Sequence, residues 1–305
     1  MITFRRNVMK APAGGQGATV DGASGQGSVA KDFGAKNGAT ISNLGTILTD
    51  VDRALGRTKP PALEVIFVEP QPIGRLPRGG RSSTNPFGHA LVRYTRPSGE
   101  QTAVNVGGRP GAPLITRFAP EEYFYGTTNF DSGNTQGGVY NRRMIGVSVD
   151  ELPQEQLAAL DAYFLDLEER NQAGEAAYFI IASKVVNLVN RFVPGTQADL
   201  GNCALWMSKG LASAGIISKS TEWPKKLAVD LFETHERLNP EGTHVVSYDR
   251  VTHSAASKRG LDSRGPLSGS PRDLARSVRF WDLGKLAEVR VRVPEGSMHA
   301  EVFEA

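Results

Sequence analysis

Residues 201–211 read Gly-Asn-Cys-Ala-Leu-Trp-Met-Ser-Lys-Gly-Leu, and they contain Cys203, the one cysteine among the 305 residues. Gly201 and Asn202 are typical of a turn and a helix cap, and the apolar residues from Ala204 onward predict a helix. Cys203 then lies at or beside the first helical turn, where backbone N–H groups and the positive end of the helix dipole favour a thiolate. The same position also suits a small buried apolar residue.

A single cysteine narrows the possible chemistry. It cannot form a disulfide within the chain, and a zinc site would need three or four ligands close together. We therefore predict no metal and no cofactor. If Cys203 is a nucleophile, a base is needed elsewhere in the chain, and a histidine is the usual choice.

The first candidate base is His89, within Asn-Pro-Phe-Gly-His-Ala-Leu-Val-Arg-Tyr at residues 85–94. Loop residues precede the histidine and a strand pattern follows it. A second strand pattern at 101–108 follows a turn at 96–99, which predicts a hairpin. Asn105 on the second strand lies within reach of His89 in a suitable register. An amide there would fix the tautomer of the imidazole.

Two other interpretations of the histidines stay open. His89 on an edge strand bonded to a loop carbonyl would be purely structural. His244 opens another apolar strand, Thr-His-Val-Val-Ser-Tyr at 243–248, and is an alternative base for Cys203. His89 is favoured because its preceding flank is more loop-like and a clear hairpin follows it. His235 lies on a polar helix face and is expected to be solvated.

These motifs resemble the circularly permuted papain-like superfamily, which includes relatives of NlpC-type peptidases, lecithin retinol acyltransferase-like proteins and a bacterial lipoprotein acyltransferase-like family. Gly-His-Ala-Leu-Val-Arg-Tyr resembles their histidine strand, and Asn-Cys before an amphipathic helix resembles their nucleophile helix. The resemblance implies a papain-like core over about residues 62–250, with the cysteine last in the chain. Several relatives carry histidine where this chain has Asn105.

Cys203, His89 and Asn105 thus have the residue types of a nucleophile, a base and its orienting partner. The expected function is a cysteine-dependent hydrolase or acyltransferase that acts on an acyl, amide or thioester bond of a small-molecule, lipid or peptide substrate. The backbone N–H of Cys203 or Ala204 would stabilise the oxyanion. The alternatives are a non-catalytic binding or scaffold domain on the same fold, and a redox-sensing cysteine.

Composition excludes several other classes. Hydrophobic residues make up 39% and charged residues 22% of the chain, which are ordinary values for a globular protein. The formal net charge is only +3, without the dense basic stripe that is typical of nucleic-acid binding. No stretch approaches the roughly 20 apolar residues of a transmembrane helix. We expect an intracellular protein, either cytoplasmic or organellar.

Residues 1–60 differ in composition from the rest. Residues 11–46 are rich in Gly, Ala, Ser and Asn, and we predict that residues 1–60 are largely disordered. The first ten residues are basic and lack acids, which is compatible with a mitochondrial or plastid transit peptide or with an ordinary flexible tail. A short helix is predicted within 41–56, around Ile41, Leu44, Leu48 and Val51.

Residues 61–305 are predicted to form one α+β domain, an antiparallel sheet packed against helices that include the Cys203 helix. Its further predicted strands lie at 63–68, 143–149 and 288–293. A helix is predicted after Pro153, with a solvated acidic face that includes Asp161, and another at about 176–192. A third helix is predicted after Pro224, with Leu227, Leu231 and Leu238 pointing inward. Segments 71–85, 121–143 and 253–275 are predicted loops. The aromatic residues of 121–143 either line a pocket or pin the loop to the core.

Overall fold

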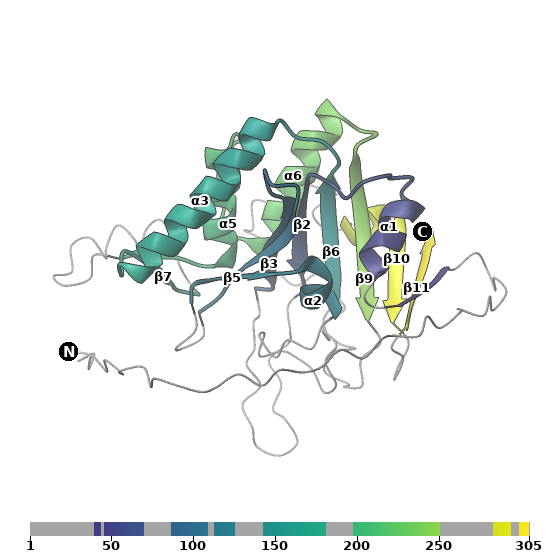
Figure 1. The fold of residues 1–305 in the computed structure, drawn as a ribbon, viewed down its shortest axis with the longest axis horizontal. Helices are drawn as coiled ribbons and strands as arrows, with labels where there is room; N and C mark the ends of the chain where they lie inside the picture. The colour runs from purple at the N-terminus through teal and green to yellow at the C-terminus, as the bar shows by residue number, and fades with distance from the viewer. Residues whose placement is uncertain are drawn as a thin grey trace, which may run out of the picture. The chain divides into compact units, whose positions relative to one another are not determined.

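A computed structural model gives the fold (Figure 1). The structure describes residues 40–43, 46–69, 87–108, 113–125, 143–180, 198–250, 283–293 and 299–304. The chain divides into two compact units, 1–34 and 35–305, and every described residue belongs to the second unit. The predictions of disorder or a transit peptide in the first 39 residues, and the predicted loops at 71–85 and 253–275, lie outside the described residues.

A mostly antiparallel sheet forms the centre of the second unit (Figure 1). In the described residues its strand order is β1-β11-β10-β9-β6-β2-β3-β4-β5, and only the pair β9–β10 is parallel. The strands are β1 (Thr40–Asn43), β2 (Leu63–Val68), β3 (His89–Thr95), β4 (Gln101–Val106), β5 (Ile115–Phe118), β6 (Met144–Val149), β9 (Thr243–Arg250), β10 (Val289–Val293) and β11 (His299–Glu304). Two short parallel strands, β7 (Ala176–Tyr178) and β8 (Asp199–Gly201), form a separate ribbon.

Helices cover both faces of this sheet. One hydrophobic cluster packs α3 (Gln154–Gln172), α5 (Cys203–Ser213) and α6 (Pro224–Leu238) against the strands, and a second includes α1 (Ile47–Ala54) and α2 (Pro120–Tyr125). Strand β2 shows why both faces are apolar: Leu63, Val65 and Phe67 enter the first cluster, whereas Ile66 and Val68 enter the second. Side chains alternate across a strand, so a continuous apolar run must be covered on both sides.

The α+β class is confirmed, and most of the predicted core elements are present. Strand β2, the hairpin β3–β4, strands β6, β9 and β10, and helices α3, α5 and α6 lie where the sequence predicts them. Gly99, in the predicted hairpin turn, has a φ of 87° that a residue with a side chain rarely adopts. None of the helices within the described ranges combines the length and apolar character that a membrane crossing requires.

Some predictions are wrong in detail. The helix predicted within 41–56 is present as α1 over Ile47–Ala54, but Ile41 belongs to strand β1, which pairs with β11, and both elements lie within the range 1–60 that was predicted to be largely disordered. Residues 176–178 of the predicted helix at 176–192 form strand β7, and the part from residue 181 lies outside the described residues. Leu238 is 75% exposed rather than inward, because it is the last residue of α6.

The aromatic residues after Pro120 belong to the core. Tyr123 and Phe124 are buried, and the ring of Phe124 packs on Tyr248 with centroids 4.6 Å apart. These two side chains therefore fix α2 to the sheet rather than line a pocket. The rest of the predicted loop, from residue 126 to 142, lies outside the described residues.

Candidate active site around Cys203

Cys203 is the first residue of α5, as the sequence predicts. Asn202 caps the helix: its Oδ1 accepts a hydrogen bond from the backbone N–H of Leu205 at 2.8 Å. Its Nδ2 donates to the carbonyl of Glu222 at 3.0 Å. A Cβ on Gly201 would lie 2.4 Å from the indole of Trp206, so only glycine fits before the cap. The helix start is therefore held both by its own cap and by a contact with the segment before α6.

The rest of α5 holds the cysteine in place by burial. Most of its residues are buried, which is expected of a helix that is apolar around most of its circumference. It ends at Ser213 with Ala214 as its C-cap, and the next residue, Gly215, has a φ of 71°. The N–H of Gly215 donates to the carbonyl of Ala212 and the N–H of Ile216 to that of Leu211, which is the Schellman arrangement. Both ends of the helix are thus defined by local hydrogen bonds.

His89 is the first residue of β3, and a glycine sets its position. Gly88 has a φ of 77°, and a Cβ there would lie 2.6 Å from the carbonyl oxygen of Val68. A residue with a side chain would be strained by the backbone conformation and would also clash with the neighbouring strand. Gly88 therefore turns the chain tightly into the sheet at the point where the imidazole emerges.

The hairpin register brings Asn105 to His89. Strand β3 pairs with β4 so that Leu91 lies opposite Asn105, which makes His89 and Asn105 diagonal neighbours. The His89 Nε2 lies 2.5 Å from the Asn105 Oδ1. A carbonyl oxygen can only accept, so Nε2 carries the proton that is donated, and in the neutral ring Nδ1 is left as the basic nitrogen.

The thiol of Cys203 lies against His89. Burial by itself raises the pKa of this thiol. The charge of His89, a hydrogen bond with its ring, and hydrogen bonds from the backbone N–H groups of Ala90 and Ala204 outweigh burial, so the pKa is lowered from its ordinary value. Each of these groups stabilises negative charge on sulfur, as does the N-terminal end of α5.

The structure therefore brings the three predicted site residues together, in the order Cys203, His89, Asn105. They are 3%, 7% and 4% exposed, respectively. Burial to this degree excludes most water, so the hydrogen bonds among these groups are stronger than they would be in solvent. The arrangement can generate a nucleophilic sulfur beside a ring able to take and return a proton. The catalytic role itself stays a prediction.

His244, the alternative base, lies far from Cys203. Across the sheet, His244 of β9 lies opposite Ser148 of β6, and Ser148 lies opposite Glu64 of β2. Glu64 in turn lies opposite Arg93 of β3, which is four residues along that strand from His89. Three strand spacings separate β9 from β3, about 14 Å, and four residues along a strand add about 13 Å in the other direction. The alternative pairing of Cys203 with His244 is therefore not formed.

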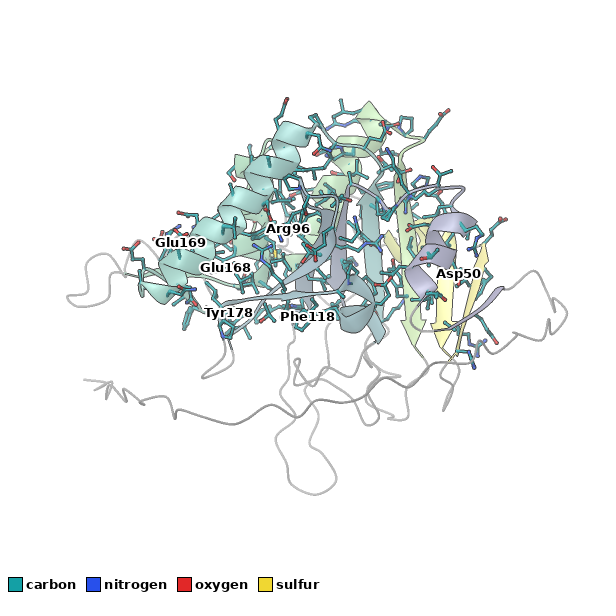
Figure 2. All side chains as sticks on the ribbon, in the orientation of Figure 1. Asp50, Arg96, Phe118, Glu168, Glu169 and Tyr178 are labelled. Carbon is teal, nitrogen blue, oxygen red and sulfur yellow. The ribbon has the colours of Figure 1, made fainter. Side chains whose placement is uncertain are left out.

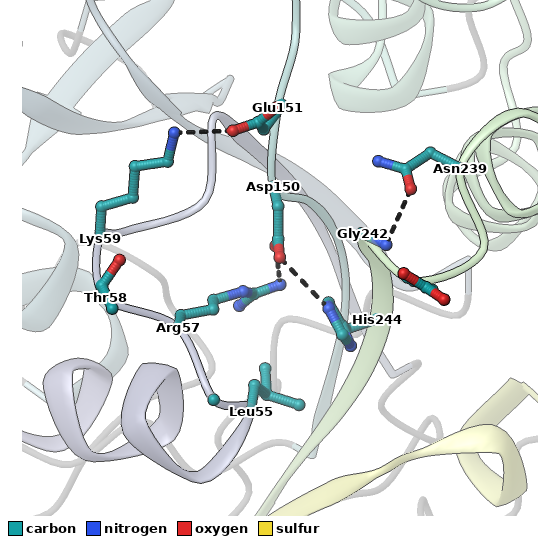
Figure 3. Close-up of a pocket in the computed structure, with 11 residues that line it drawn as sticks. Leu55, Arg57, Thr58, Lys59, Asp150, Glu151, Asn239, Gly242 and His244 are labelled. Carbon is teal, nitrogen blue, oxygen red and sulfur yellow. Dashed lines mark hydrogen bonds and ion pairs between the residues drawn. The ribbon is translucent and has the colours of Figure 1, made fainter.

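Instead, His244 belongs to a charged cluster with its own depression in the surface, of about 370 Å³ (Figure 3). Its Nε2 lies 3.3 Å from Asp150, and its Nδ1 lies 2.9 Å from Glu288. These two carboxylates raise the pKa of His244 to about 9. Arg57 contacts Asp150 from the other side at 2.5 Å. A ring that is charged at neutral pH has no free nitrogen to act as a base, so the cluster is an ionic link between strands.

Two further polar residues are buried against expectation. His235 is not solvated: it is 8% exposed, and its Nε2 lies 3.0 Å from the carbonyl oxygen of Ile216. Asp161 does not belong to a solvated face either, since it accepts hydrogen bonds from Tyr94 at 2.6 Å and from Arg96 at 3.1 Å. Arg96 lies beside α3 in Figure 2. Asp161 thus faces strand β3 and its following turn, and His235 faces the turn after α5, so neither side chain points to solvent.

Two aromatic side chains pack together beside the site. The rings of Phe87 and Trp223 have centroids 6.3 Å apart. Phe87 lies two residues before His89, and Trp223 follows Glu222, whose carbonyl accepts a hydrogen bond from Asn202. Phe87 belongs to the histidine motif at 85–94, but nothing in the local sequence pairs it with Trp223, which is distant in the chain. Within the described ranges, no group of three or more His, Cys, Asp or Glu side chains is placed to hold a metal ion.

Comparisons of this chain with protein-family models, with curated proteins and with solved structures found no match.

Proposed function

We propose that this protein is a cysteine-dependent acyl-group enzyme, a hydrolase or an acyltransferase, with Cys203 as nucleophile, His89 as general base and acid, and Asn105 as the residue that orients the imidazole. The observation that carries the proposal is the Cys203 thiol against an imidazole whose other nitrogen is 2.5 Å from an amide oxygen. A histidine with only a structural role has no need of a thiol on one side and an orienting amide on the other.

In the first half of the reaction, His89 Nδ1 takes the proton of the Cys203 thiol and the sulfur attacks the carbonyl carbon of the substrate. The C=O π electrons move onto oxygen, and the backbone N–H of Cys203 or Ala204 at the start of α5 stabilises this oxyanion. When the intermediate collapses, the bond to the leaving group breaks, and His89 gives its proton to that group. The products are a thioester on Cys203 and a free amine, alcohol or thiol.

In the second half, His89 takes a proton from water or from another acceptor as its oxygen, nitrogen or sulfur attacks the thioester carbonyl. The C–S bond breaks, and the proton returns to the Cys203 sulfur. With water the product is a carboxylic acid, and with another acceptor it is a new ester, amide or thioester. The same site thus performs hydrolysis or transfer, depending on which acceptor enters.

A permuted papain-like core is part of the same proposal. Three features support it: the chain order of histidine, amide and then cysteine, the antiparallel hairpin β3–β4 that carries His89 and Asn105, and the contact of α5 with those two strands. In this arrangement the sheet supplies the base and a later helix supplies the nucleophile. Fold alone does not establish an activity, so the experiment must address the thiol itself.

A second candidate function is a non-catalytic binding or scaffold domain on the same fold. The observation that favours it is the 3% exposure of Cys203, which also suits a thiol that merely fills space in the core. The two functions differ in the reactivity of the thiol in the folded protein.

The test is the pH dependence of Cys203 alkylation by iodoacetamide, measured by mass spectrometry in wild type, His89→Ala and His235→Gln. For an active site, wild type reacts in the folded state with a midpoint below the ordinary thiol pKa. In His89→Ala the midpoint rises, because burial still raises the thiol pKa and the lowering contributions of His89 are gone. His235→Gln replaces another buried histidine and leaves the midpoint unchanged.

Acylation by p-nitrophenyl acetate then separates the enzyme from a merely reactive thiol. We expect a burst of p-nitrophenolate equal to the enzyme concentration, together with a mass shift on Cys203 that is absent in Cys203→Ser. Alkylation only after denaturation would overturn the proposal in favour of the scaffold function. Peroxide oxidation of a low-pKa thiol that no ester acylates would favour a redox sensor.

A further inference from the structure

We infer that Thr116 of β5 is a positioning residue for the proposed reaction, and that its hydroxyl holds the side-chain amide of Asn105 while that amide orients the imidazole of His89. This inference rests on the proposed function and adds one more polar group to those behind the thiol. Its evidence is the register of β4 and β5, together with a buried hydroxyl that has no hydrogen bond in the described part of the chain.

Strand register places Thr116 directly beside Asn105. Strands β4 and β5 pair so that Asn105 lies opposite Thr116, and the next pair on the same face is Ala103 with Phe118. Ala103 belongs to the hydrophobic cluster that includes α1 and α2, and Phe118 packs against that cluster. Side chains alternate across a strand, so Thr116 and Asn105 project from this same face. Directly opposite side chains have Cβ atoms about 4.5–5.5 Å apart, which lets a hydroxyl and an amide reach each other.

The hydroxyl of Thr116 is buried without a partner. Its Oγ1 is shielded from solvent and makes no hydrogen bond with any group in the described ranges. Buried polar atoms are nearly always hydrogen-bonded, so an exception needs a reason, and a role in catalysis is one. Valine would fill the same volume without an unpartnered hydroxyl, and it suits a strand equally well. A threonine here is explained by a partner that its hydroxyl reaches in another rotamer.

Asn105 supplies that partner. Its Oδ1 lies 2.5 Å from Nε2 of His89, which leaves the N–H groups of Nδ2 to donate elsewhere. Rotation about the Cα–Cβ bond of Thr116 exchanges its hydroxyl and methyl groups and turns Oγ1 toward the neighbouring strand. The Nδ2 of Asn105 then donates to Oγ1, so the amide is held at both ends.

The proposed reaction strengthens this contact. When His89 takes the proton of the Cys203 thiol, the ring becomes charged and its hydrogen bond to the amide oxygen becomes charge-assisted. The polarised amide is then a better donor through Nδ2, because hydrogen bonds in a chain strengthen one another. Thr116 therefore stabilises the charged ring through Asn105 and does not touch the substrate.

The experiment compares Thr116→Val with Thr102→Val in the burst rate of p-nitrophenolate from p-nitrophenyl acetate and in the pH profile of Cys203 alkylation. Thr102 is a matched control: it is a buried threonine of β4 that lies opposite Tyr94, on the other face of the sheet. For Thr116→Val we expect a burst about fivefold slower, the loss of one ordinary hydrogen bond, and a higher alkylation midpoint because the charged ring is less stabilised. Thr116→Ser keeps the hydroxyl and restores both values, and Thr102→Val changes neither.

Two further measurements separate positioning from a structural role. The denaturation midpoint of Thr116→Val should equal or exceed that of wild type, because a methyl group replaces an unpartnered buried hydroxyl. In a double-mutant cycle, Thr116→Val should have no further effect on the burst rate once Asn105 is replaced by alanine, because the hydroxyl acts only through that amide.

Four outcomes would overturn this inference and leave the proposed function standing. They are a wild-type burst rate and alkylation midpoint in Thr116→Val, an equal loss in Thr102→Val, an undiminished effect of Thr116→Val in the Asn105→Ala background, and a lowered denaturation midpoint. A wild-type thiol that no ester acylates would overturn the proposed function and this inference with it.

Discussion

At the scale of single residues, the site depends on a proton held in one place. The amide oxygen of Asn105 accepts from Nε2 of His89, and this fixes which nitrogen faces the thiol. The contact is short and both residues are buried, so water does not compete for it. Asn105 therefore acts through the ring and not on the substrate.

The first prediction concerns Asn105→Ala. Losing one hydrogen bond of about 1–1.5 kcal/mol corresponds to a loss of about tenfold in the rate of acylation. A purely structural role would not change the midpoint of the alkylation pH profile, whereas loss of orientation moves that midpoint upward. Asn171→Ala is a suitable control, because Asn171 makes a similar contact with the N–H of Leu114 remote from the thiol. If both variants behave alike in acylation, the orienting role is refuted.

The second prediction concerns Gly88, which places His89. In Gly88→Ala the alanine must keep a positive φ, and its methyl group clashes with the carbonyl of Val68. We therefore expect a loss of about 2–3 kcal/mol in the free energy of unfolding. Gly99→Ala is a matched control with a φ of 87° and no atom within 4 Å of the new Cβ, and its cost is about 1 kcal/mol. Chemical denaturation measures both. Equal losses would show that the contact with Val68 does not matter.

At the scale of elements, the two parts of the candidate site are positioned by different means. Strand β3 is held on both sides by its neighbours β2 and β4, so the position of His89 follows from register. Helix α5 is held instead by its cap, its burial and the close approach of Gly210 to Tyr163 of α3. The strand cannot slip by one residue without exchanging its two faces, so the register fixes the position of His89.

The third prediction concerns the ionic link between β9, β6 and β10. Because the pKa of His244 is raised to about 9 from 6.5, its contribution to stability is full below about pH 6.5 and is lost as the pH rises through about 9. Its size is about 1–2 kcal/mol, since hydrogen bonds to charged groups are involved. Unfolding free energies of wild type and His244→Gln should converge between pH 7 and pH 10. A constant difference over this range would contradict the link.

At the scale of the whole sheet, its two faces are stabilised differently. The face under α3, α5 and α6 carries the larger apolar cluster, with buried polar groups such as Asp161 and Lys225 on its helices, whereas on the face under α1 and α2 buried charges pair across the strands themselves. Arg93 lies 2.9 Å from Glu64, and the hydroxyl of Tyr248 donates to Glu64 at 2.9 Å. Asp52 of α1 lies 3.9 Å from Arg93. These charges join a helix near the start of the fold to the central strands.

The fourth prediction concerns this buried pair. Glu64→Gln leaves the charge of Arg93 in the core without its nearest carboxylate, and we expect a loss of about 3 kcal/mol in the free energy of unfolding. The exposed pair of Lys59 and Glu151, 2.9 Å apart, provides the comparison, and Glu151→Gln costs less than about 0.5 kcal/mol. Thermal and denaturant unfolding at pH 7 measure the difference. Similar small effects of both variants would mean that Asp52 alone balances Arg93.

Several elements could be predicted because their signals are local. The cap at Asn202, the hairpin turn at Gly99 and the apolar runs of β2 and β6 each depend on residues close together in the chain. The signals that failed were local patterns with more than one meaning. Ile41 lies in a strand although it fits the spacing of a helix, because pairing with β11, far along the chain, decides its structure.

The sequence by itself determined the α+β class, a lone cysteine at a helix start and two histidines that each open a strand. Only the tertiary structure decided between those histidines. Register and strand order put His89 beside the thiol and move His244 three strands away, among carboxylates that keep it charged. Residue types and spacing specify what a side chain can do, but which groups meet across distant segments depends on how the sheet is assembled.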